Sequence, residues 1–133
     1  MMMGVLAIVG HTQENEEKAI KEVITSFAKA GDKNDVEKLA TFLDANYRIV
    51  MNRQFGGNGV SITDRDTYLE KIKSKEWGGG HREITISKTV INGVSASVLV
   101  VFKGSKISFT SLILLVKNSE GNWLLISDTP IVS

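Results

Sequence analysis

The sequence from Arg82 to Val132 reads REITISKTVI-NG-VSASVLVVFK-GS-KISFTSLILLVK-NSEG-NWLLISDTPIV, four apolar runs separated by short polar turns. Within each run apolar residues tend to recur at every second position, which is the period of a β-strand. Asn92-Gly93 is a two-residue hairpin signal because both residues tolerate a positive φ. The stretch therefore predicts a four-stranded antiparallel meander.

The N-terminal part of the chain has the period of a helix instead. Residues 14–30 place apolar side chains along one helical face, and Gly31 stands where a C-cap is expected. Residues 34–43 predict a second, shorter helix that begins with Asn34 and Glu37 as a capping pair. Two helices are thus expected before the first strand.

The middle of the chain is predicted to add a strand and a third helix. Residues 46–52 alternate as a strand does, and the glycines of residues 53–62 indicate a loop or an irregular hairpin. A capping pair at Thr63 and Asp66 predicts a helix over residues 64–77. Three consecutive glycines, residues 78–80, should end it, since each is about 1 kcal/mol less favourable than Ala in a helix. The expected class is α+β, three N-terminal helices packed on a curved, mainly antiparallel sheet.

Composition limits the function classes. The chain has 133 residues, 42% of them hydrophobic, which suits one globular domain. Sixteen Lys and Arg are interleaved with fifteen Asp and Glu, so the chain has no basic block of the kind that binds nucleic acid. The absence of cysteine excludes a disulfide framework, a thiolate zinc site and a cysteine nucleophile, and leaves the redox compartment open.

The first twelve residues form an apolar segment without the features of a typical secretory signal. MMMGVLAIVG is too short to span a bilayer, the first basic residue is Lys18, and no small-residue cleavage triplet follows. We therefore expect a single domain over residues 1–133, with 1–12 as an apolar N-terminal arm, no membrane association and a cytoplasmic location. The alternative is a remnant signal segment and a periplasmic or secreted protein.

The order of elements resembles that of the NTF2-like superfamily, in which a bent sheet wraps a long N-terminal helix into a cone. The resemblance covers the chain from about Glu14. INGVSASVLVVF and ISFTSLILLVKNSEGNWLLIS, residues 91–102 and 107–127, are similar to the SnoaL-like and lumazine-binding-like branches. The resemblance implies a ligand pocket and not a particular activity, because the superfamily contains isomerases, dehydratases, cyclases and proteins without known catalysis.

The strand period predicts which side chains face the cone. With Trp123 facing inward, as the resemblance implies, Ser127 also points inward and Asp128 points outward. On the first meander strand Ile84, Ile86 and Val90 are expected to form the apolar face, and His81 and Glu83 the opposite one. No acidic residue is then expected inside the cone.

Four side chains are predicted to line the pocket and one to be protonatable at its mouth. Tyr47, Tyr68, Trp77 and Ser127 are the ligand-binding candidates, and His81 is the catalytic candidate, with Glu83 as its partner. The three glycines lack the context of a phosphate-binding loop. His11 and His81 are too few for a histidine metal centre, so we expect neither a metal nor a cofactor.

Three functions of different classes remain open at this point. The first, which we favour, is a binder of a small, largely apolar molecule without catalysis. The second is an isomerase, dehydratase or cyclase that uses His81 for proton transfer. The third is a structural dimer whose pocket is filled by side chains. Because the central strands are apolar on both sides, a homodimer through the outer face of the sheet is expected.

Overall fold

The computed structural model describes the backbone of residues 2–133 and the side chains from residue 13 onward. Its elements follow in the order α1 (Met2–Asp32), α2 (Val36–Ala40), β1 (Leu43–Asn52), β2 (Val60–Asp64), α3 (Arg65–Lys73), β3 (Glu83–Asn92), β4 (Ser95–Lys103), β5 (Ser108–Lys117) and β6 (Trp123–Val132). Three helices are therefore present, but α3 follows two strands and only α1 is long. The α+β class is confirmed, and the expectation of three N-terminal helices is confirmed only in part.

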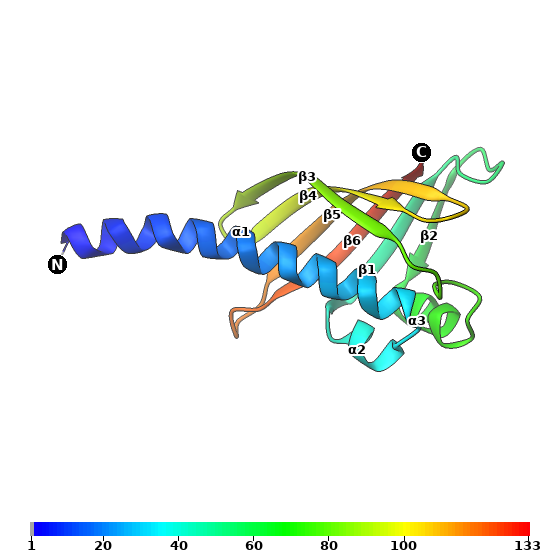
Figure 1. Ribbon diagram of the computed structural model, residues 1–133, viewed down its shortest axis with the longest axis horizontal. Helices are drawn as coiled ribbons and strands as arrows, with labels where there is room; N and C mark the ends of the chain where they lie inside the picture. The colour runs from blue at the N-terminus through cyan, green and yellow to red at the C-terminus, as the bar shows by residue number, and fades with distance from the viewer. Residues whose placement is uncertain (1) are drawn as a thin grey trace.

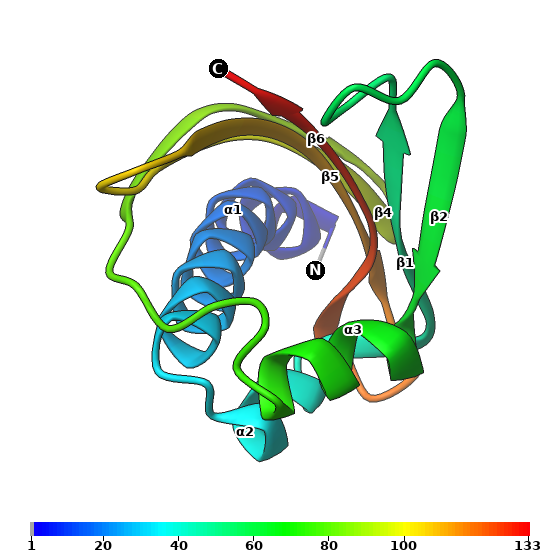
Figure 2. The ribbon, with the colours of Figure 1, turned by 90° about the vertical axis from the view of Figure 1, so that its right-hand side faces the viewer.

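The six strands form one sheet in the order β2-β1-β6-β5-β4-β3. All neighbours are antiparallel except β1 and β6, which run parallel. The predicted meander is thus β3 to β6, and the irregular hairpin predicted over residues 53–62 includes the start of β2. The sheet curves around α1, as Figure 2 shows, and α1 begins well beyond the sheet edge in Figure 1. No helix in the described part of the chain is long and apolar enough to cross a membrane.

The core lies between α1 and the concave face of the sheet. Ile20, Ile24 and Phe27 are spaced three and four residues apart, so they share one face of α1, and all three are almost completely buried. They belong to the same core cluster as Val98 on β4 and Ile113 on β5, both fully buried. This packing holds the long helix across the concave face of the sheet. One end of the cone is enclosed by α3 and by loops.

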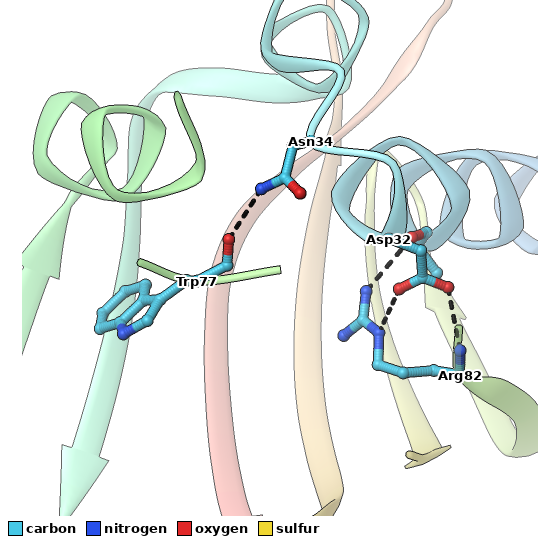
Figure 3. Close-up of polar contacts among 5 residues, drawn as sticks. Asp32, Asn34, Trp77 and Arg82 are labelled. Atoms are coloured by element: carbon cyan, nitrogen blue, oxygen red, sulfur yellow. Dashed lines mark hydrogen bonds and ion pairs between the residues drawn. The ribbon is translucent and has the colours of Figure 1, made fainter. Parts of the chain in front are cut away.

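Asn34 connects the end of α1 to the segment after α3, a role that the capping prediction missed. The N-cap of α2 is Asp35, whose side chain accepts from the backbone N–H of Lys38. Asn34 instead has a φ of 52°. Its amide donates to the carbonyl of Trp77 at 2.9 Å (Figure 3) and to the carbonyl of Ile72 at 2.8 Å. The capping pair of Asn34 and Glu37 is wrong, because Asn tolerates a left-handed conformation and its side chain satisfies a neighbouring segment.

The third helix is shorter than predicted at both ends. Asp64, and not Thr63, is its N-cap and accepts from the N–H of Thr67 at 2.9 Å. The helix ends at Lys73, before the glycines, and the chain reverses through Lys75 at a φ of 67°. The glycines 78–80 therefore do not end the helix; they form the connection that leads to β3.

Two β-bulges change which side chains face the cone. In β3 the register with β4 shifts between Ile86 and Lys88, so that Val90 is 48% exposed and the prediction that it faces inward is wrong. In β6 the partners of Leu114 and Leu115 are Ser127 and Leu125, which leaves Ile126 as an extra residue. Each bulge inverts the alternation beyond it.

Candidate functional site

A cavity of about 670 Å³ opens at the wide end of the cone. It lies between α1, α3, the strands β1, β4, β5 and β6, and the loops that precede β3 and β5. Its aromatic lining contains seven of the nine aromatic residues of the chain: Phe27, Tyr47, Phe55, Tyr68, Trp77, Phe102 and Phe109. The predicted pocket residues Tyr47, Tyr68 and Trp77 are thus brought together, which no spacing in the sequence shows directly.

Asp128 lies on the cavity side of β6, contrary to the prediction that it points outward. It pairs with the fully buried Ile113 on β5, and its exposed fraction is 9%. Burial raises the pKa of its carboxyl to about 6, against the opposing effects of the Ser111 hydroxyl and the Arg82 guanidinium. Its Oδ1 has no hydrogen-bond partner among residues 13–133. The cavity therefore contains a buried carboxyl group with a free acceptor atom.

Ser127 takes the opposite position and does not line the cavity. It pairs with Leu114, whose side chain is 43% exposed on the outer face of the sheet. The bulge at Ile126 is the reason: without it Ser127 would face the cone and Asp128 would not. The prediction of an inward Ser127 is therefore wrong, and Ser111 on β5, which is buried and lines the cavity, supplies the hydroxyl instead.

Two tyrosines stand close to Asp128 at the buried end of the cavity. The rings of Tyr47 and Tyr68 lie 5.5 Å apart, and Trp77 follows at 6.2 Å from Tyr68. Burial is the main cause that raises the pKa of both phenols, and the charge of Asp128 contributes to each. The hydroxyl of Tyr47 has no hydrogen-bond partner in the described part of the chain. A phenol hydroxyl can both donate and accept a hydrogen bond.

Arg82 lines the cavity with a guanidinium group that already has partners. Its Nε donates to Asp32 Oδ1 at 2.6 Å, and its backbone N–H donates to the other oxygen of that carboxylate at 3.0 Å (Figure 3). Its Nη2 donates to the carbonyl of Ala28 at 3.2 Å, and the group lies 4.9 Å from the centre of the Phe102 ring. Asp32 therefore balances much of this positive charge and fixes the side chain as one wall of the cavity.

His81 lies at the rim of the cavity and is exposed. Its predicted partner Glu83 does not line this cavity; both residues line a second hollow, outside the cone. The neighbouring glycines position this rim. Gly78 and Gly79 have φ values of 80° and 88°, and a Cβ on Gly78 would lie 2.5 Å from the Gly31 carbonyl oxygen. The N–H of Gly79 already donates to that carbonyl, which leaves that amide unavailable to an anion.

A second hollow, of about 830 Å³, lies between α1 and β3 outside the cone. Lys21, Lys29, Lys33 and Glu83 line it, and it opens broadly to solvent. None of the unpartnered buried polar atoms found in residues 13–133 belongs to its lining. No group of three or more potential metal ligands occurs in the described residues. The cone cavity is therefore the candidate site, although it is the smaller of the two.

Neither a family model nor a curated protein matches the sequence. Solved structures do match. An NTF2-like protein of unknown function from Shewanella baltica is similar over 90% of this chain and 94% of its own, with a TM-score of 0.76 and 20% identity. The chain has the NTF2-like fold.

Two further structural neighbours are described by an activity. A ketosteroid isomerase-like protein from Erwinia carotovora aligns over 86% of this chain and 94% of its own, with a TM-score of 0.69 and 15% identity. A scytalone dehydratase-like protein from Novosphingobium aromaticivorans aligns over 93% and 88%, with a TM-score of 0.61 and 18% identity. At these identities the similarity shows the fold, and the fold does not select among its activities.

Proposed function

We propose that this NTF2-like chain binds a small, largely apolar molecule in the cone cavity. The observation that supports the proposal is the pair of unpartnered polar atoms, Tyr47 Oη and Asp128 Oδ1, in a cavity otherwise lined largely by aromatic side chains. An unsatisfied buried polar group costs about 1 to 3 kcal/mol. A ligand with one polar end would relieve that cost, and its apolar body would be desolvated against the rings.

Binding is tested with a neutral aromatic probe, naphthalen-2-ylmethanol, titrated into ¹⁵N-labelled protein. We expect amide shifts at Ile49 and Asp128, which face the cavity side, and none at Leu112 or Leu114 on the outer face. Fluorescence gives a second readout, because Trp77 lines the cavity and Trp123 does not. The Trp77→Phe variant should lose the fluorescence response and keep the amide shifts. Shifts confined to the outer face, or saturation that is not reached at millimolar probe, would contradict the proposal.

Proton-transfer catalysis is the second candidate, with Asp128 in place of His81 as the acting group. A carboxyl group with a pKa of about 6 can accept a proton near neutral pH. The hydroxyls of Tyr47 and Tyr68 are placed to donate to an oxygen that gains negative charge. The two neighbours described as isomerase-like and dehydratase-like agree with this chemistry. An enolisable carbonyl compound of naphthalene size is therefore the substrate class to test.

The test is solvent-deuterium exchange into 2-tetralone, followed by NMR. Wild-type protein should accelerate exchange next to the carbonyl, Asp128→Asn should abolish the acceleration, and the exposed His81→Asn should retain it. If His81→Asn alone removes the activity, the assignment made from the sequence is correct and the one made from the structure is not. If 2-tetralone binds and no exchange is accelerated, the function is binding without catalysis.

We also propose that two copies associate through the outer face of the sheet. Leu99, Leu112 and Leu114 are 37 to 47% exposed there, while Val98, Val100 and Ile113 on the same strands are fully buried in the cone. Fully burying an exposed Leu is worth about 1.5 to 3 kcal/mol, so burying the part of each that remains exposed is worth roughly 1 kcal/mol, which favours self-association over hydration. Light scattering should give twice the 14.6 kDa chain mass, and Leu114→Glu should give one chain mass. A wild-type monomer at micromolar concentration would exclude this interface.

A further inference from the structure

The charged side chains that line the cavity indicate which charge a ligand should carry. Among the described residues that line the cavity two are acidic, Asp128, which is buried, and Glu76, which is exposed. The other charged lining residues of the described chain are Arg82 in the wall and Lys106 toward the mouth. Glu76 is bonded to Lys71, and Arg82 to Asp32, so each already has a counter-ion. The Asp128 carboxyl has none.

We propose that the cavity selects an organic cation, a protonated amine carried on a ring system, with the ammonium group donating to Asp128 and the rings packed among the aromatic side chains. This inference rests on the proposed binding function and names its ligand class. It uses two independent features: a carboxyl group about nine-tenths buried with an unpartnered Oδ1, and the aromatic side chains that line the same cavity.

The chemistry of the donors and acceptors favours an amine over a carbonyl compound or an acid. An ionised carboxylate only accepts hydrogen bonds, so its free oxygen requires a donor from the ligand. An ammonium group supplies donors and a compensating charge, and aromatic faces attract cations through their quadrupole. An acid would bring a second negative charge beside Asp128, with Arg82 already committed to Asp32 and Ala28. A neutral alcohol can occupy the cavity, but it gains no attraction between opposite charges from the Asp128 carboxylate.

The surroundings of Asp128 predict how amine binding depends on pH. Tyr47 from β1, Tyr68 from α3, Ser111 from β5 and Arg82 before β3 are the polar groups that act on the carboxyl, and both phenols stay neutral at working pH. The pKa of Asp128 is raised to about 6. Amine affinity should therefore increase as pH rises from 5 to 7.5, and an acceptor ligand that needs a protonated carboxyl should show the opposite trend. The His81→Asn variant serves as the control for the imidazole at the rim.

The experiment compares three probes with one ring: naphthalen-2-ylmethanamine, naphthalen-2-ylmethanol and 2-naphthoic acid. Calorimetry at pH 7.5 should show the amine binding about ten- to a hundredfold more tightly than the alcohol, with the acid weakest. Asp128→Asn should remove most of that preference, because Asn keeps the shape of the side chain and carries no charge. Glu76→Gln, which removes an acidic group near the mouth, should preserve the preference.

The outcomes separate this inference from the function on which it rests. If the alcohol binds as tightly as the amine, or the acid binds most tightly, the cation inference is overturned and the cavity remains a binding site. If none of the three probes binds, the binding function itself fails. Should Asp128→Asn not fold, the wild-type pH dependence decides, and an amine affinity that falls between pH 5 and 7.5 overturns the proposal.

Discussion

Replacing Asp128 by Asn should stabilise the protein at neutral pH and have little effect in acid. The folded-state pKa of Asp128 is about 6, and the ordinary value is 3.8. Between these values the folded state binds more protons than the unfolded state, so stability falls as pH rises. The penalty is absent below about pH 4 and complete above about pH 6. A difference of roughly two pH units, at about 1.4 kcal/mol each, amounts to about 3 kcal/mol.

The physical reason is the transfer of a carboxylate from water into a cavity lined by aromatic rings, where only Ser111 and the distant charge of Arg82 favour the ionised form. Asn has the same shape and no charge, so it avoids the ionisation penalty. Its amide keeps one unsatisfied group, which reduces the gain to about 2 kcal/mol at pH 7.5.

Urea unfolding at pH 4, 5, 6 and 7.5, followed by tryptophan fluorescence, measures the effect. The free-energy difference between Asp128→Asn and wild type should increase across this range, with half of the change near pH 5. The exposed Glu120→Gln in the turn before β6 is the matched control and should show no such increase. A difference that is constant with pH, or an Asn variant less stable than wild type at pH 7.5, would refute the reasoning about a buried ionisable group.

Three further substitutions test the scaffold of the site by urea unfolding. Asn34→Ala should lower the free energy of unfolding by about 2 kcal/mol, because it removes two side-chain hydrogen bonds of 2.8 and 2.9 Å at a residue with positive φ. Gly78→Ala should lower the free energy of unfolding by about 2 kcal/mol or more, since its φ is 80° and the new Cβ would lie 2.5 Å from a carbonyl oxygen. Gly80→Ala is the control: its new Cβ meets nothing within 4 Å, so the free energy of unfolding should change by less than about 0.5 kcal/mol. Tyr47→Phe should gain about 1 kcal/mol without ligand, because it removes an unpartnered buried hydroxyl; a loss of stability would indicate that this hydroxyl is bonded.

Periodicity was sufficient to predict the meander and the long first helix, but not the complete order of the helices. The alternation in residues 82–132 correctly predicts four antiparallel strands, and the helical face of residues 14–30 lies within α1. These features are local consequences of burying one face of each element, which is why one sequence reveals them. The prediction that Tyr47, Tyr68 and Trp77 line the cavity agrees with the structure, in which most aromatic residues of the chain do so.

The position of the acidic group could not be predicted, because a bulge has no reliable signature in one sequence. Strict alternation from Trp123 reaches Ser127 on the inner face, and the extra residue at Ile126 moves Asp128 there instead. Residues 123–126 are all apolar and residues 127–129 are all polar, so the sequence shows no alternation there that would decide whether Ser127 or Asp128 faces inward. Arg82 was missed for a different reason, since its partner Asp32 is fifty residues away in the sequence.

The bulge at Ile126 bears on both faces of the sheet at once. With strict alternation, Asp128 would project from the outer face beside the exposed Leu112 and Leu114. The inward polar group of β6 would then be the hydroxyl of Ser127 instead of a carboxylate. The extra residue puts Thr129 and Ser127 next to those leucines instead, so the outer face stays uncharged where we propose that two copies associate. It also moves the one carboxylate of β6 into the cavity, where we propose that the ligand is recognised. Deleting Ile126 should therefore weaken self-association and amine binding together, whereas Leu114→Glu should weaken only the first.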